Sequence, residues 1–171
     1  RDDRAGIFAY INLGGTFIDP SCYKTWIRMD SKIKEVIHGM DTYSVNEKGD
    51  IVPDPKGSNG IEFLKQNIDK IKFKSTESIK RDIKVKYLEK NKKNMFISKY
   101  IVIPPFYRDT NTGKGGTVGV GGINILYRNL ILAVQALNST QDYGFDNSGM
   151  LRARIQEIIL QIYDWFAGNA N

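Results

Sequence analysis

The glycine-rich residues 113–122 come nearest, in type and spacing, to a loop that binds phosphate groups. They contain six glycines and one cation, Lys114. A Walker-type loop needs Gly-x-x-x-x-Gly-Lys-Ser/Thr, but Arg108 stands where its first glycine belongs and Gly115 follows the lysine. A dinucleotide-binding loop is also excluded, because Asn124 stands where that pattern needs its last glycine.

Residues 116–119 do fit the Gly-x-x-Gly clamp of KH-type nucleic-acid-binding modules, although the match is only four residues long. We interpret residues 113–122 as a flexible loop and keep a mononucleotide site as the alternative. Repeated glycine allows a backbone to approach nucleic acid closely.

Few side chains could hold a metal or act as a nucleophile. Cys22 is the only cysteine and His38 the only histidine, which excludes a disulfide framework and a cysteine-based zinc site within this chain. Asp50 and Asp54 are the nearest candidates for a metal-binding acid pair, and they fall in a predicted hairpin and its exit loop. We therefore predict no catalytic residue, no metal site and no cofactor in this segment.

The positive charge is concentrated in one stretch. The 171 residues carry a net charge of +6, but residues 62–99 hold twelve Lys or Arg against five Asp or Glu, a net +7. Such a patch is typical of a nucleic-acid contact, and Lys80, Arg81 and Lys84 are its candidate contacts. Lysine supplies point charge without the arginine fork, so base-specific recognition is not expected. The alternative is a solvated, lysine-rich helix face.

The first two thirds of the chain predict a small mixed body. Aromatic and β-branched residues predict a strand over 6–13, and apolar spacing predicts a helix over 22–38. Residues 42–52 read as a hairpin with its turn at 46–50. A helix is predicted after Asn59, because Asn59 and Glu62 resemble a capping box. A second, amphipathic helix is predicted to be capped by Ser75 or Thr76. In that second helix Ile79, Ile83 and Tyr87 share one face; residues 95–103 predict a buried strand.

The last third predicts two helices that pair. Apolar residues step by four and three from Ile123 to Leu137, and again from Leu151 to Trp165. A polar loop over 139–149 joins them, so we expect an antiparallel helical hairpin.

Two proline- and tyrosine-containing motifs resemble a known family. Val102-Ile103-Pro104-Pro105 with Arg108 precedes the glycine loop, and Asn124, Leu126, Tyr127 and Arg128 follow it. This order resembles the clamp of the β′ (largest) subunit of multisubunit DNA-directed RNA polymerases. There a Val-Ile-Pro-Pro-x-x-Arg segment precedes the lid loop, and Asn-x-Leu-Tyr-Arg-Arg opens the clamp coiled coil.

Earlier segments are similar in the same order. Tyr10-Ile11-Asn12-Leu13 stands where the family has a Gly-His-Ile-Glu-Leu strand, and residues 60–64 resemble its Gly-Ala-x-Ala-Ile helix. The first hairpin helix departs from the family, since it is apolar after Arg128 where the family is rich in Arg and Asn. This departure puts docking of a sigma-like initiation factor in doubt and would fit a divergent subunit of viral or mobile-element type.

The resemblance implies a division of the chain into three parts. These are a clamp body at 1–108 with the basic segment 62–99, a lid-like loop at 109–122, and a hairpin at 123–171. The implied fold class is α+β and mainly helical, with short strands and a projecting antiparallel two-helix coiled coil. The implied nucleic-acid contacts outside the basic segment are Arg108, Lys114 and Arg128. Tyr127 fits the hairpin's apolar stripe better than a contact, and Arg128 has a simple ion pair as its alternative role.

The resemblance also implies partners. They are the DNA template, the RNA–DNA hybrid, other polymerase subunits and an initiation factor docked on the hairpin. The candidate docking residues are Gln135, Tyr143, Phe145, Arg152, Arg154 and Gln156.

The family's catalytic motif, Asn-Ala-Asp-Phe-Asp-Gly-Asp, is not present in this segment. The resemblance therefore implies a non-catalytic part of a nucleotidyltransferase whose Mg²⁺ and Zn²⁺ sites lie in other segments. No apolar run is long enough to span a bilayer, and we expect a cytoplasmic protein with no membrane partner. The alternative is a free-standing basic α+β module that binds nucleic acid or protein and is unrelated to polymerases.

Overall fold

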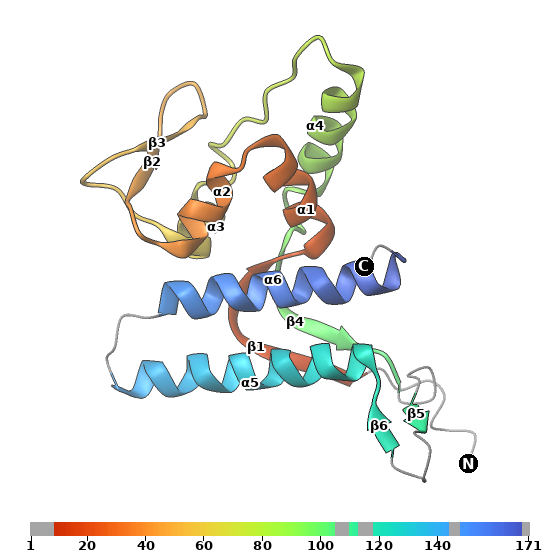
Figure 1. Ribbon diagram of the computed structural model, residues 1–171. Coiled ribbons are helices and arrows are strands. Elements are labelled where there is room, and N and C mark those ends of the chain that lie inside the picture. The colour runs from red at the N-terminus through yellow and green to blue at the C-terminus, as the bar shows by residue number, and fades with distance from the viewer. Residues whose placement is uncertain (1–8, 105–109, 113–117, 144–147, 169–171) are drawn as a thin grey trace.

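The computed structural model describes residues 9–104, 110–112, 118–143 and 148–168, and these form a mainly helical α+β structure (Figure 1). The strands of this part pair as the antiparallel two-stranded sheets β1–β4, β2–β3 and β5–β6. In chain order the elements are β1 (Ala9–Ile18), α1 (Pro20–Met29), α2 (Lys32–His38), β2 (Tyr43–Val45), β3 (Ile51–Pro53), α3 (Gly60–Asn67), α4 (Ile79–Asn91), β4 (Phe96–Val102), β5 (Thr110–Thr112), β6 (Val118–Val120), α5 (Gly122–Tyr143) and α6 (Ser148–Phe166).

The longest sheet joins two segments that lie about ninety residues apart in sequence. Tyr10 pairs with Ile101 and Ile11 with Tyr100, and the register then shifts between Asn12 and Phe17. β1 extends past the predicted end at residue 13 to Ile18, and residues 6–8 of the predicted strand lie outside the described residues. Gly14 lies in this irregularity with a φ of 67°, and a side chain there would collide with Asn138 of α5. The bulge therefore allows α5 to approach β1 closely.

The helix predicted over residues 22–38 is wrong in one respect, because the chain forms two helices there. Asp30 ends α1 in an extended conformation, and its carboxylate accepts a hydrogen bond from the backbone N–H of Lys32 at 3.1 Å. This local bond competes with continuation of the helix. At the other end of α1, Asp19 caps the helix and Pro20 occupies its first turn.

The hairpin predicted over 42–52 is confirmed as β2–β3. The predicted cap at Asn59 and the predicted burial of the strand over 95–103 are not confirmed. Asn59 makes no cap bond to α3, and its amide instead donates to the carbonyl oxygens of Gly39 and Asp41, both at 3.0 Å. The strand predicted to be buried, β4, is only half-buried, and among the described residues it pairs with β1 alone.

The two predicted C-terminal helices are confirmed, but the hairpin does not project from the body. α6 packs against α5 on one side and against α1 and α2 on the other (Figure 1). Ile155, Ile159 and Ile162 are fully buried, because α6 has apolar residues toward both sets of neighbours. The hairpin is therefore part of the body, and its second helix runs through the centre.

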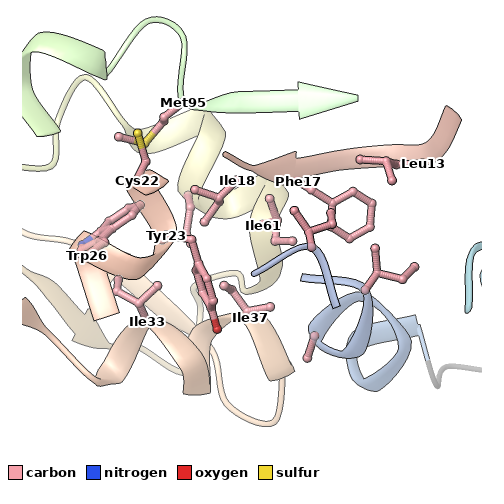
Figure 2. Packing of buried hydrophobic residues seen from close by; sticks show 14 of the residues in the cluster. Leu13, Phe17, Ile18, Cys22, Tyr23, Trp26, Ile33, Ile37, Ile61 and Met95 are labelled. Atoms are coloured by element: carbon pink, nitrogen blue, oxygen red, sulfur yellow. The ribbon is translucent and has the colours of Figure 1, made fainter. Parts of the chain in front are cut away.

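One continuous core results from this arrangement. Figure 2 shows Phe17 and Ile18 of β1 among side chains from α1, α2, α3 and α6. Tyr23 of α1 and Ile37 of α2 lie in the same cluster, and Tyr23 donates a hydrogen bond to Glu157 of α6 at 2.6 Å. In the described part of the chain, no helix has both the length and the apolar character needed to cross a membrane.

Among the described residues, Gln156 is the buried polar side chain without an aromatic ring. Gln156 of α6 has an exposed fraction of 0%, and its amide oxygen accepts from the N–H of Ile18 at 2.8 Å. Its amide nitrogen donates to the carbonyl of Ile18, also at 2.8 Å. The amide thus satisfies both backbone groups of Ile18 as a neighbouring strand would, and it joins α6 to the end of β1.

We expect Gln156→Leu to lower the free energy of unfolding by about 2–4 kcal/mol. Leucine fills similar space but leaves the N–H and C=O of Ile18 buried without partners. Urea denaturation followed by circular dichroism measures the change. Gln161→Leu, at an exposed position of the same helix, is the matched control and should change stability by less than about 0.5 kcal/mol. Equal losses in the two variants would contradict the role given to Gln156.

Candidate nucleic-acid interface

The basic segment helps to build one hollow, which we call the basic hollow. Its volume is about 280 Å³, and it lies between the end of α1, the β2–β3 hairpin, residues 71–74 and the start of α4. The charged residues that line it are Lys32, Lys72, Lys74, Arg81, Asp30 and Asp50. Four cations against two acids make this a positively charged surface.

Residues 71–74 are held in place by backbone contacts on both sides. The N–H of Lys72 donates to the carbonyl of Gly49 at 3.1 Å, which attaches the segment to the β2–β3 turn. Arg81 Nε of α4 donates to the carbonyl of Lys74 at 2.9 Å, and Nζ of Lys92, just after α4, donates to the carbonyl of Ile71 at 2.6 Å. The segment has no regular secondary structure, yet its position is well defined by these bonds.

Aromatic rings form the apolar floor beneath the cations. Trp26 and Phe73 meet edge to face, with ring centroids 5.4 Å apart and an interplanar angle of 84°. Lys92 Nζ lies 5.2 Å from the centroid of Phe73, within cation–π range. Trp26 is 3% exposed, so it supports the hollow from below and does not offer a stacking surface to a base.

The cations differ in how far they are already neutralised. Lys74 forms an ion pair with Asp50 at 2.6 Å, and Arg81 is engaged by the carbonyl of Lys74. Among the described residues, neither Lys32 nor Lys72 forms an ion pair with an acid. These two ammonium groups are therefore the best placed to contact an external phosphate.

The hollow has the chemistry of a binding surface. Its ionisable groups are ammonium, guanidinium and carboxylate groups, with the carboxylates beside cations. Within the described part of the chain, no cluster of His, Cys, Asp and Glu could hold a metal ion.

The predicted nucleic-acid contacts that the structure describes do not gather on one surface. Arg108 and Lys114 lie outside the described residues. Lys80 is exposed on the outer side of α4, Lys84 is half-buried, and Arg81 reaches the basic hollow. Arg128 is exposed on α5, which lies on the other side of α6 from α4 (Figure 1).

The predicted docking residues separate in the same way. Gln135 and Arg154 are exposed, and Arg152 is half-buried with its guanidinium over Gly15. The side chain of Tyr143 and all of Phe145 lie outside the described residues. The prediction for Gln156 is wrong, because its amide is buried and bonded to Ile18, where no partner can reach it.

Sequence reasoning missed Lys32, Lys72 and Lys74. Lys72 and Lys74 belong to the basic segment, so the sequence shows their charge. It does not show that they lie beside the end of α1. Lys32 lies outside the basic segment, and nothing in the sequence marks it as a contact. Its place beside the hollow depends on the break in the helix at Asp30.

Three segments that carry the polymerase resemblance meet in space. Tyr10 and Ile11 pair with Ile101 and Tyr100 across β1–β4. The hydroxyl of Tyr127 donates to the carbonyl of Ile101 and accepts from the N–H of Ile103, both at 3.3 Å. Tyr127 is buried, in agreement with its predicted place on the apolar stripe.

The only cysteine is not a reactive nucleophile. Cys22 is 2% exposed and lies beside Met95 in the core (Figure 2). Burial, with a smaller contribution from the Asp19 carboxylate, raises the pKa of its thiol to about 11. The thiolate is the reactive form, so Cys22 acts here as a small buried apolar residue of the core.

No protein-family model matches the chain, and no curated protein matches it either.

We expect Cys22 to react with iodoacetamide at pH 8 at least about 100-fold more slowly in the folded protein than in urea. Raising the thiol pKa from 9.0 to about 11 lowers the thiolate fraction by that factor. Mass spectrometry of timed samples measures the rates. Equal rates in the two conditions would show that Cys22 is accessible.

We expect Gly49→Ala to disturb the basic hollow. Gly49 has a φ of 79°, and a Cβ there would lie 2.6–2.8 Å from the side chain and backbone nitrogen of Lys72. Gly60→Ala is the control, because Gly60 has the same φ but no atom within 4 Å of the added carbon. The control isolates backbone strain of about 1 kcal/mol. Thermal unfolding should show a larger loss for Gly49→Ala, and equal losses would mean that residues 71–74 are not held as described.

Proposed function

We propose that this chain is a non-catalytic, clamp-like part of the largest subunit of a DNA-directed RNA polymerase and contacts nucleic acid through its backbone phosphates. The observation that carries the proposal is the meeting of three separate segments of the resemblance around Ile101. β1 pairs with it on one side, and Tyr127 of the Leu-Tyr-Arg motif bonds to its carbonyl. Segments that resemble one family and also pack together support a common origin.

The proposed contacts fall into two groups. The lid-like loop 109–122, with Arg108 and Lys114, is proposed to lie at the upstream end of an RNA–DNA hybrid. The basic hollow is proposed to hold a neighbouring stretch of template or hybrid backbone through Lys32 and Lys72. Both are contacts of lysine or arginine to phosphate, so they stabilise binding without selecting a sequence.

The remaining proposals concern partners and location. Other polymerase subunits, the template DNA and an initiation factor on the exposed side of the hairpin, at Gln135 and Arg154, are the proposed partners. A cytoplasmic location follows from that role.

The second candidate is a free-standing basic α+β binding module. It is favoured by one specific observation, namely that α6 packs along the body and the hairpin does not project. Such a module would use the same basic hollow but would have no polymerase partner.

We expect Lys72→Gln to weaken binding of a fluorescently labelled RNA–DNA hybrid about three- to tenfold at low salt. Losing one phosphate contact should also reduce the slope of log K against log salt by about 1. Lys99→Gln is the matched control, since Lys99 belongs to the same basic segment but lies exposed on β4, away from the hollow. Fluorescence anisotropy over a salt series measures both quantities.

The outcomes separate the possibilities. Equal weakening by the two substitutions would mean diffuse attraction by the net charge, and salt-independent binding would contradict the phosphate contacts.

The two candidate functions are distinguished by the coding sequence beyond Asn171 and by purification of the full-length protein. An Asn-Ala-Asp-Phe-Asp-Gly-Asp motif and co-purifying nucleotide-incorporating activity support the polymerase, and the absence of both favours the free-standing module.

A further inference from the structure

The outer surface of α4 carries a row of large, exposed apolar side chains. Ile79 is 77% exposed, Ile83 63% and Tyr87 38%. They recur at every fourth position and so form one row along the helix, which we call the α4 stripe. The sequence predicts the row, but the structure turns it outward, because Leu88 is the residue through which α4 is buried.

Tyr87 is held rigidly in the stripe. Its hydroxyl lies 2.7 Å from Oγ of Ser21, and Ser21 in turn bonds to the Asp19 carboxylate that caps α1. The ring is thus fixed at its polar end while its exposed side remains open. A preorganised tyrosine loses little conformational entropy when a partner covers it, so it is suited to anchor an interface.

Lysines border the stripe on both sides. Lys80, Lys86 and Lys90 are all exposed, and each lies three or four positions from a stripe residue. Of the two acids on α4, Asp82 is half-buried, and Glu89 is exposed and paired with Lys92 at 3.4 Å. The surface therefore has an apolar centre and a cationic rim, which is the usual arrangement of a protein–protein interface with charge selection at its edge.

We propose that the α4 stripe docks an acidic amphipathic helix of a partner protein. Apolar side chains of that helix would cover Ile79, Ile83 and Tyr87, and its carboxylates would face Lys80, Lys86 and Lys90. Nucleic acid suits this surface less well, because phosphates would contact the central isoleucines and gain nothing from them. A second copy suits it less well still, because the same three lysines would oppose one another.

The proposal is independent of the proposed nucleic-acid function. The α4 stripe lies on the side of α4 opposite Leu88, whereas the basic hollow is reached from this helix by Arg81. A partner on the stripe would leave Lys32 and Lys72 accessible.

The test uses a designed helical peptide as the probe. The peptide has about four turns, carries leucine at every fourth position and has glutamate on both flanks of that row. We expect the full chain to bind it with a dissociation constant of about 10 μM or tighter. Ile83→Ser should weaken binding at least about tenfold, and Lys86→Gln with Lys90→Gln should weaken it several-fold and reduce its salt dependence.

Matched controls keep the test decisive. Leu132→Ser removes a similarly exposed side chain, 51% exposed, from α5 and should leave peptide binding unchanged. Circular dichroism checks that the substituted chains fold, which is expected because Ile83 and Leu132 are both exposed. A scrambled peptide of the same composition should bind at least about tenfold more weakly.

Each remaining outcome overturns the proposal. These outcomes are no binding of the peptide, binding that Ile83→Ser leaves intact, and equal binding of the scrambled peptide. Phosphatidylserine vesicles and a DNA duplex serve as competing probes. If Ile83→Ser abolishes binding to either of these but not to the peptide, the stripe serves a membrane or a nucleic acid and the proposal fails. Loss of hybrid binding by Lys72→Gln with peptide binding retained would support both proposals, since it would show that the two surfaces act separately.

Discussion

The pair of hydrogen bonds between Gln156 and the backbone of Ile18 is the constraint on which the rest of the structure depends. It sets the position of α6 against the end of β1, where the chain turns into α1. α6 then contacts α1 and α2 on one side and α5 on the other. A buried amide costs stability unless both its groups are bonded. These bonds therefore favour the observed position of α6 along β1 over positions shifted along the helix axis.

The orientation of α4 explains why the basic segment has two surfaces with different chemistry. α4 contacts the body through Leu88 and through the bond from Tyr87 to Ser21, so the helix has a fixed rotation. That rotation directs Arg81 toward the hollow and Ile79 and Ile83 toward solvent. The charge of residues 62–99 is therefore divided between the basic hollow and the rim of the α4 stripe.

The packing also bears on the two candidate functions. The clustering of β1, Ile101 and Tyr127 is the structural argument for a polymerase clamp, since segments far apart in sequence meet in one place. The packing of α6 along the body points the other way, because a projecting coiled coil would have apolar residues on one side only. Ile155 and Ile159, buried in a helix with neighbours on both sides, explain why this hairpin does not project.

Local patterns in the sequence determined the local structure of this protein. Apolar spacing was enough to predict α5 and α6, the turn residues at 46–50 predicted β2–β3, and the lysines located the basic segment, because each of these signals acts over a few residues. The tertiary structure decided what each surface faces. Gln156 looks like a surface residue until Ile18, 138 positions away, is placed beside it, and the hollow around Lys32 and Lys72 forms only when α1, β3 and α4 converge. Contacts of such long range depend on the packing of the whole core, which no single stretch of sequence encodes.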